Sequence, residues 1–161
     1  LRQSFYAFPE YKESKNFTLY FANIIYKPSY ISLQTALSFY GIIPEAVPEI
    51  TSVTTLKTKT FSNDFGEYSY KNIKPDLMFG YDLKEMEGGR RIMFATPEKA
   101  LADLLYLYPF YNTERELEEL RLDESYMEDD LNMDRLMEYS YRIGSKALIN
   151  RIDMLRKVYN L

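Results

Sequence analysis

The stretch PSYISLQTALSFYGIIPE, residues 28–45, has the pattern of a short helix with a marked beginning and end. Pro28 disfavours helix in the residue before it, and Ser32 is a residue type that often accepts a hydrogen bond from a first-turn amide. Gly41 stands where many helices end in a left-handed residue. The pattern predicts a helix over residues 33–40 with one face in the core. Its apolar residues recur at helical spacing: Leu33, Ala36, Leu37 and Tyr40.

The segments on either side predict an α+β fold. Apolar residues on one face predict a helix over residues 15–26, and a weak alternation predicts a strand over residues 4–8. After Pro48 the period changes, because β-branched and alternating residues favour strands. The sequence therefore predicts two N-terminal helices and a four-stranded, mostly antiparallel sheet, followed by a helical C-terminal half. The expected strands cover residues 50–56, 67–71, 76–81 and 91–95.

The C-terminal half begins with a clear helix start. Thr96 can cap the helix, Pro97 suits its first position, and Glu98 favours the positive helix N-terminus. Residues 112–135 are rich in carboxylates and predict two short helices separated near Asp123. A last helix is expected from about Ser145 to Tyr159, and the whole chain, residues 1–161, is expected to form one domain.

Composition excludes several classes of site. The 161 residues include no cysteine and no histidine, so a disulfide, a thiolate nucleophile and a histidine base or ligand are excluded. No apolar run approaches the roughly 20 residues of a membrane span. The chain is expected to be cytoplasmic, because the lack of cysteine fits a reducing compartment. The net charge of −4 argues against a free-standing nucleic-acid binder.

No arrangement of residues has the spacing of an active site. A nucleotidyltransferase needs a Gly-Ser that holds phosphate near paired carboxylates, but Gly144-Ser145 follows Glu128 and Asp130 in the reversed order. Glu67 and Lys71 are too far apart for a nuclease pattern. The acidic run lacks the glycine turn and the ligand spacing of a calcium loop. We therefore expect no catalytic residue, no cofactor and no metal site.

The basic residues offer two candidate interaction surfaces. If the predicted strands are neighbours, six of the basic residues form a cationic strip that could touch phosphates. The plainer interpretation is solubilising charge at the edge of a sheet. The strip would consist of Lys57, Lys59, Lys71, Lys74, Arg90 and Arg91. A second group, gathered by helical spacing near the C-terminus, consists of Arg142, Lys146, Arg156 and Lys157.

Four stretches, residues 28–45, 50–55, 66–70 and 95–106, are similar to the segments that mark the AbiEi antitoxins of type IV toxin–antitoxin systems. The resemblance extends over roughly residues 6–108. It implies a bacterial, non-catalytic antitoxin that acts in abortive infection, a defence against phage. Such a protein represses its own operon by binding operator DNA through an N-terminal winged helix-turn-helix.

On this resemblance, residues 1–8 would be the end of that missing winged helix-turn-helix. The rest would be the C-terminal domain, which counteracts a nucleotidyltransferase toxin without forming a tight complex. Two alternatives stay open: a protein-interaction domain of an unrelated transcriptional regulator, using its tyrosines and acidic helices, or a nucleic-acid-processing enzyme.

Overall fold

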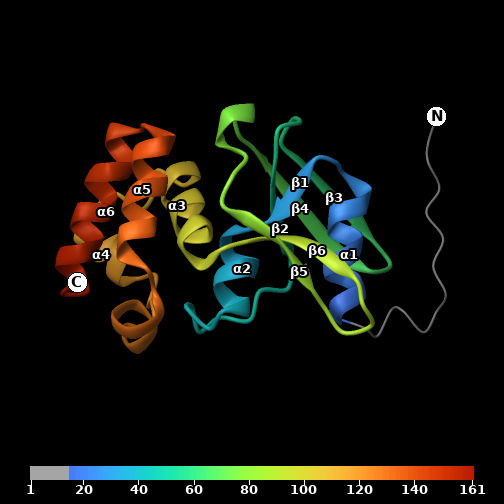
Figure 1. The fold of residues 1–161 in the computed structure, drawn as a ribbon, viewed down its shortest axis with the longest axis horizontal. Coiled ribbons are helices and arrows are strands. Elements are labelled where there is room, and N and C mark those ends of the chain that lie inside the picture. The colour runs from blue at the N-terminus through green and yellow to red at the C-terminus, as the bar shows by residue number, and fades with distance from the viewer. Residues whose placement is uncertain (1–14) are drawn as a thin grey trace.

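The computed structural model describes residues 15–161 and shows a mixed sheet between helical layers (Figure 1). The predicted strand at residues 4–8 lies outside the described residues. The strands are β1 Ser29–Ile31, β2 Ile50–Thr54, β3 Lys59–Asn63, β4 Gly66–Asn72, β5 Tyr81–Glu85 and β6 Arg91–Ala95. The helices are α1 Lys15–Ile25, α2 Leu33–Phe39, α3 Pro97–Leu107, α4 Glu114–Glu118, α5 Met133–Ile143 and α6 Lys146–Val158, with a 3₁₀ turn at Pro75–Leu77 and a π-helical turn at Tyr126–Asp130.

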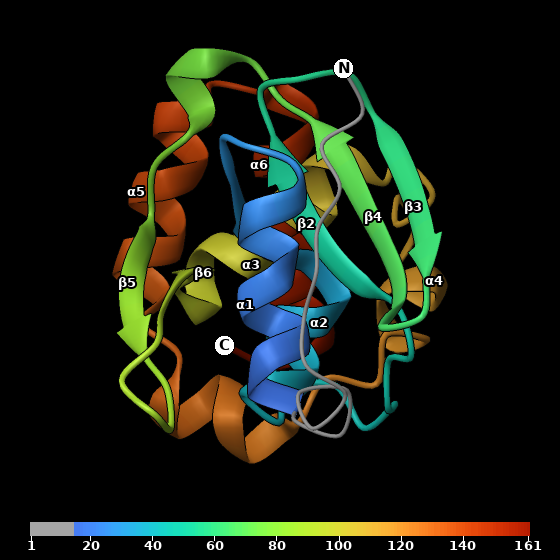
Figure 2. The ribbon, with the colours of Figure 1, turned by 90° about the vertical axis from the view of Figure 1, so that its right-hand side faces the viewer.

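The six strands form one sheet in the order β3-β4-β2-β1-β6-β5. Three neighbouring pairs are antiparallel, namely β1 with β2, β3 with β4, and β5 with β6. The pairs β2 with β4 and β1 with β6 are parallel. Helix α1 lies over one side of the sheet and α2 and α3 over the other, with α4, α5 and α6 beyond α3 (Figures 1 and 2).

The predicted four-stranded, mostly antiparallel sheet is wrong, because the sheet has six strands and is mixed. Strand β1 has only three residues, too few to show an alternation, and β3 is an exposed edge strand without a buried face. The expected strand at residues 76–81 is instead a 3₁₀ turn that begins at Pro75. Gly80 then adopts a left-handed backbone (φ 73°), and the strand begins only at Tyr81.

Helix α2 forms where the sequence predicts it, but Ser32 does not cap it with its side chain. The first-turn amide of Thr35 donates instead to the hydroxyl of Thr51 on β2, at 3.0 Å. That hydroxyl donates to the carbonyl of Ser32 at 2.7 Å. Leu33, the first residue of the helix, has a left-handed backbone (φ 59°), which is uncommon for a residue other than glycine. The first-turn amide is therefore capped by a residue of the neighbouring strand β2, and the Ser32 hydroxyl donates instead to Asp103 on α3.

Local signals placed most of the other helices correctly. Helix α1 matches its predicted range, and the Thr96 hydroxyl caps α3 by accepting from the amide of Lys99. The acidic segment contains α4 before Asp123, as predicted. The second short helix, predicted from Leu131 and Leu136, is instead a π-helical turn that ends at Asp130, followed by α5. Helix α5 carries Leu136 and extends to Ile143, beyond the predicted range. Among residues 15–161, no helix has the length and apolar character needed to cross a membrane.

Candidate functional site

Five lysines lie together at one end of the central strands. Ser29 on β1 is paired with Thr54 on β2, which is paired in turn with Asn72 on β4. The chain therefore enters β1 and leaves β2 and β4 at the same end of the sheet. We call the group found there the lysine cluster; its members are Lys27, Lys57, Lys59, Lys71 and Lys74. The sequence predicted four of these together but missed Lys27, which lies between helix α1 and Pro28.

Side-chain hydrogen bonds fix the loops that carry the lysine cluster. The Tyr26 hydroxyl donates to the Lys57 carbonyl at 2.9 Å. The Asn72 side-chain amide donates to the carbonyls of Thr55 and Leu56, at 3.2 and 2.7 Å. These contacts hold the loop between β2 and β3 against the end of β4, so the positions of the lysines are set by ordered backbone.

The lysine cluster is an exposed concentration of positive charge. All its members are exposed except Lys71, which is half-buried, and none forms an ion pair with a described residue. The ammonium of Lys59 lies 4.7 Å from the Phe61 ring centroid, whereas that of Lys71 lies 5.2 Å from the Tyr108 ring centroid on the opposite side of the sheet. Cations beside aromatic rings at a surface suit phosphate and base contacts.

The two arginines of the predicted strip lie elsewhere. Arg90 and Arg91 follow the hairpin between β5 and β6, and the Arg90 guanidinium lies 5.6 and 5.8 Å from the ring centroids of Phe17 and Tyr20, near the start of α1. The lysine cluster contacts Tyr26, just beyond the end of α1. Helix α1 has 11 residues and is therefore about 16 Å long. The predicted strip is thus divided into two basic groups at opposite ends of α1.

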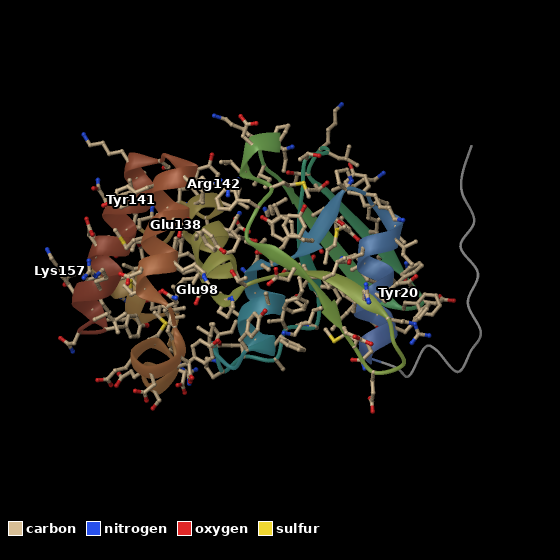
Figure 3. The ribbon with its side chains drawn as sticks, viewed as in Figure 1. Tyr20, Glu98, Glu138, Tyr141, Arg142 and Lys157 are labelled. Carbon is tan, nitrogen blue, oxygen red and sulfur yellow. The ribbon has the colours of Figure 1, made fainter. Side chains whose placement is uncertain are left out.

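The second predicted group is also dispersed. The Arg142 guanidinium lies 3.9 Å from the centroid of the Phe79 ring. Lys146 and Lys157 lie near opposite ends of α6, about 16 Å apart along its axis. Figure 3 shows Lys157 at the outer edge of α6 and Arg142 on the side of α5 nearer the sheet. Arg156, the fourth member, is half-buried in the last turn of α6.

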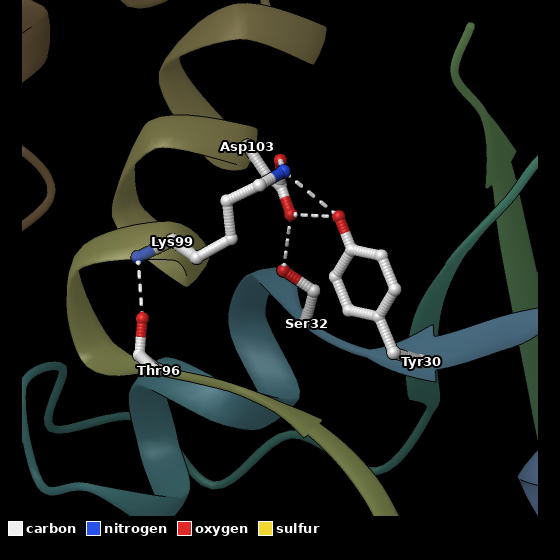
Figure 4. A network of polar contacts seen from close by, with 5 residues as sticks. All are labelled: Tyr30, Ser32, Thr96, Lys99 and Asp103. Carbon is white, nitrogen blue, oxygen red and sulfur yellow. Dashed lines mark hydrogen bonds and ion pairs between the residues drawn. The ribbon is translucent and has the colours of Figure 1, made fainter. Parts of the chain in front are cut away.

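A buried polar network joins α3 to β1 (Figure 4). The Lys99 ammonium lies 2.5 Å from Asp103 Oδ1, and the two side chains are 0% and 1% exposed. Lys99 also donates to the Tyr30 hydroxyl at 2.9 Å. The hydroxyls of Tyr30 and Ser32 each donate to Asp103 Oδ2 at 2.8 Å. Every oxygen of the carboxylate therefore has a donor, and the ammonium has two acceptors.

The environment of this network indicates a structural role. Burial raises the pKa of Asp103, and the ammonium of Lys99 together with the hydrogen bonds from Lys99, Tyr30 and Ser32 opposes that rise. Burial also raises the pKa of Tyr30, so its hydroxyl stays protonated. Lysine, serine and tyrosine can together activate a nucleophile. A substrate would need access to them, however, and these side chains are covered.

Gly80 makes room for the buried lysine. A Cβ added there would lie 2.9 Å from Lys99 Cγ, closer than real Cβ contacts allow. The left-handed backbone of Gly80 also disfavours any other residue. The connection before β5 can therefore pass over Lys99 only because residue 80 has no side chain.

The sequence contained a signal for this network. Between residues 98 and 105, helix α3 is apolar on all sides apart from three charged residues, and such a helix is normally buried. Its lysine and aspartate are four residues apart, so they can pair along one side of the helix. The charged residues are Glu98, Lys99 and Asp103, and all three are buried.

The residues of the excluded nucleotidyltransferase pattern have other roles. Gly144 is the left-handed residue that ends α5, and the Ser145 hydroxyl caps α6 by accepting from the amide of Leu148. Glu128 and Asp130 are exposed on the π-helical turn. Glu98 is buried in the first turn of α3, where it accepts a hydrogen bond from the amide of Asn132 at 2.9 Å.

Comparison with known proteins found no family model, no curated protein and no solved structure that matches this chain. The resemblance to the AbiEi antitoxins therefore stays a prediction from the four sequence segments.

Proposed function

We propose that this chain is the C-terminal, non-catalytic domain of an AbiEi-type antitoxin. It counteracts a nucleotidyltransferase toxin without a tight complex, and operator DNA is bound by a winged helix-turn-helix of the same protein. The lysine cluster is its functional surface. The observation that carries this proposal is that the four segments of the resemblance meet in one core.

Those four segments supply β1 with α2, β2, β4, and the end of β6 with α3. The first is joined to the second by reciprocal hydrogen bonds between Thr35 and Thr51. The first is joined to the fourth by the bonds from Tyr30 and Ser32 to Asp103. The third lies beside the second in the sheet. The similar segments thus form one structural unit, which supports a shared domain as the basis of the resemblance.

The lysine cluster is the part of the surface best suited to the antitoxin role. A nucleotidyltransferase toxin acts on nucleic acid or nucleotides, so its antagonist has to meet the same polyanions or the proteins that hold them. Exposed lysines attract phosphates at a distance. The acidic helices would be repelled by them.

The absence of catalysis is testable. We expect no turnover of nucleoside triphosphates, and no transfer of nucleotides to RNA, above the background of a buffer control with Mg²⁺. Glu128 and Asp130 are the carboxylates to check, because they are spaced like metal ligands. Turnover that is lost in Glu128→Gln/Asp130→Asn would overturn this part of the proposal.

Removing charge from the lysine cluster should abolish protection while leaving the fold intact. We expect Lys27→Gln/Lys57→Gln/Lys74→Gln, in the full-length protein, to fail to rescue growth of cells that express the nucleotidyltransferase toxin encoded beside it. Its melting temperature should stay within a few degrees of the wild type, because exposed charges contribute little to stability.

The matched control is Arg91→Gln/Lys146→Gln/Lys157→Gln, which removes the same charge from the other predicted groups. It should still rescue growth. Full rescue by the lysine variant, with loss of rescue in the control, would contradict a role for the lysine cluster. It would indicate that the functional surface lies at Arg91 or on α6. The absence of a nucleotidyltransferase reading frame beside the gene would contradict the antitoxin assignment itself.

A further inference from the structure

Strand β5 leaves one edge of the sheet open. It is the last strand at that edge, and among residues 15–161 only β6 pairs with it (Figure 2). Its five residues, YDLKE, are all in register with β6, so the strand has no bulge that would bend the edge away. An edge of this kind offers backbone N–H and C=O groups to a further strand.

Alternate residues of β5 direct their backbone groups away from β6. Just before the strand, the Thr96 amide donates to the Gly80 carbonyl at 2.9 Å. In an antiparallel ladder, residues that exchange hydrogen bonds with their neighbour alternate with residues that do not. Counted from Gly80, every second residue therefore bonds to β6, and the residues between them bond to nothing in the sheet. The residues whose amide and carbonyl face the open edge are Tyr81, Leu83 and Glu85.

The charged side chains of β5 are complementary to those of a second β5. If a second copy pairs antiparallel about Leu83, Asp82 lies opposite the partner's Lys84, and Lys84 lies opposite the partner's Asp82. Both pairs fall at positions that exchange no hydrogen bond between the two copies, where opposite side chains come closest. Register alone therefore places two pairs of opposite charges in contact.

Both charges are available for such a contact. Asp82 is exposed and Lys84 is half-buried, and neither forms an ion pair with a described residue. The Lys84 ammonium lies 5.1 Å from the centroid of the Tyr40 ring, and Asp82 adds to the rise in the pKa of Tyr40. The two charges therefore lie on the same face of the strand, the face that carries α2.

The other face of the strand adds an apolar contact. Leu83 is 59% exposed and is paired with Met93 on β6, which is 36% exposed. Side chains alternate between the two faces of a strand, so this pair lies on the face opposite Asp82 and Lys84. Two copies paired about Leu83 would place their leucines side by side with a methionine on each flank. This row of apolar side chains would then be removed from water.

The strand at the other edge of the sheet lacks this pattern. Lys59 is the one charged residue of β3, so pairing of β3 with its own copy would bring no opposite charges together. A lysine on an edge strand is a common protection against association. The complementary charges and the exposed leucine therefore distinguish the β5 edge from the β3 edge.

We propose that β5 pairs antiparallel with the β5 of a second copy of this chain. The two six-stranded sheets would then continue into one another, with Leu83 at the two-fold axis and an Asp82–Lys84 pair on each side of it. The same patch serves on both copies, so the contact closes as a dimer and does not propagate into a filament. The inference does not depend on the antitoxin role.

The first test is sedimentation of the whole chain over a range of concentrations. We expect a reversible monomer–dimer equilibrium with a dissociation constant in the micromolar range, because two five-residue strands bury less than the roughly 1,600 Å² of a standard interface. Asp82→Lys and Lys84→Asp each place like charges opposite one another. Each variant alone should weaken the dimer about tenfold or more.

Mixing the two single variants should restore dimers of wild-type strength, because the cations of one variant then face the anions of the other. The double variant Asp82→Lys/Lys84→Asp should restore them by itself, for the same reason. The matched control is Lys59→Asp on β3, which should leave the dissociation constant unchanged. Thermal unfolding of each variant confirms that it folds.

Three results would overturn the proposal. The first is a wild-type chain that stays monomeric at millimolar concentration. The second is a single variant of Asp82 or Lys84 that dimerises as strongly as the wild type, since the dimer would then use another surface. The third is a mixture of the two single variants that associates no more strongly than either variant alone.

A cross-link tests the register of the two strands. The chain has no cysteine, so Leu83→Cys supplies its only thiol. Opposite Cα atoms at a hydrogen-bonded pair are about 5.5 Å apart, within the range of a disulfide. Mild oxidation should therefore give far more covalent dimer with Leu83→Cys than with Phe110→Cys, where the native side chain is 60% exposed. Equal cross-linking of the two variants would contradict pairing about Leu83.

Discussion

Asp103→Ala is expected to lower the free energy of unfolding by about 3–5 kcal/mol, the usual cost of breaking a buried ion pair. The substitution leaves the Lys99 ammonium with only the Tyr30 hydroxyl as acceptor, and it removes the acceptor of the Tyr30 and Ser32 hydroxyls. The loss is a large part of the stability of an ordinary domain. Urea denaturation followed by circular dichroism measures it.

Two further variants separate the ion pair from general loss of a carboxylate. Asp153→Ala removes an exposed carboxylate from α6 and should cost less than about 0.5 kcal/mol. The double variant Lys99→Met/Asp103→Leu should be more stable than Asp103→Ala, because an apolar pair leaves no buried charge. A cost below 1 kcal/mol for Asp103→Ala would show that the network does not hold α3 in place.

Leu37→Asp is expected to unfold the domain. Leu37 is fully buried on α2, where it belongs to the single hydrophobic core. The change removes roughly 2–3 kcal/mol of apolar burial and places an unpaired carboxylate in the core. The sum approaches the whole stability of a typical domain, about 5–15 kcal/mol. We expect no cooperative thermal transition and a collapsed dispersion of amide proton signals.

Leu37→Met is the matched variant at the same position, because it keeps the volume and should cost less than about 1.5 kcal/mol. Leu83→Asp introduces the same carboxylate on β5, where the side chain is 59% exposed, and should change stability little. A folded Leu37→Asp with a normal transition would mean that α2 can leave the core without unfolding the sheet.

The predictions that were correct concern features that depend on residues close together in the sequence. Helix ends depend on nearby residues, so Gly41, Thr96 and Pro97 marked them correctly. The hairpin of β3 and β4 is also local, because only the turn at Asp64 and Phe65 separates its strands. The other pairings depend on residues far along the chain, and nothing near β2 indicated that it runs parallel to β4. The class, α+β, was therefore predictable, whereas the number of strands and their order were not.

The candidate site divides in the same way. The sequence by itself determined the absence of cysteine and histidine chemistry, the α+β class and the basic residues from which a surface could form. Only the tertiary structure decided that Lys27 joins the lysine cluster and that Arg90 and Arg91 leave it, because strand register sets which loops meet. The tertiary structure also decided that the Ser32 hydroxyl does not cap its own helix but donates to Asp103, because packing of α3 against β1 places that carboxylate within hydrogen-bonding distance.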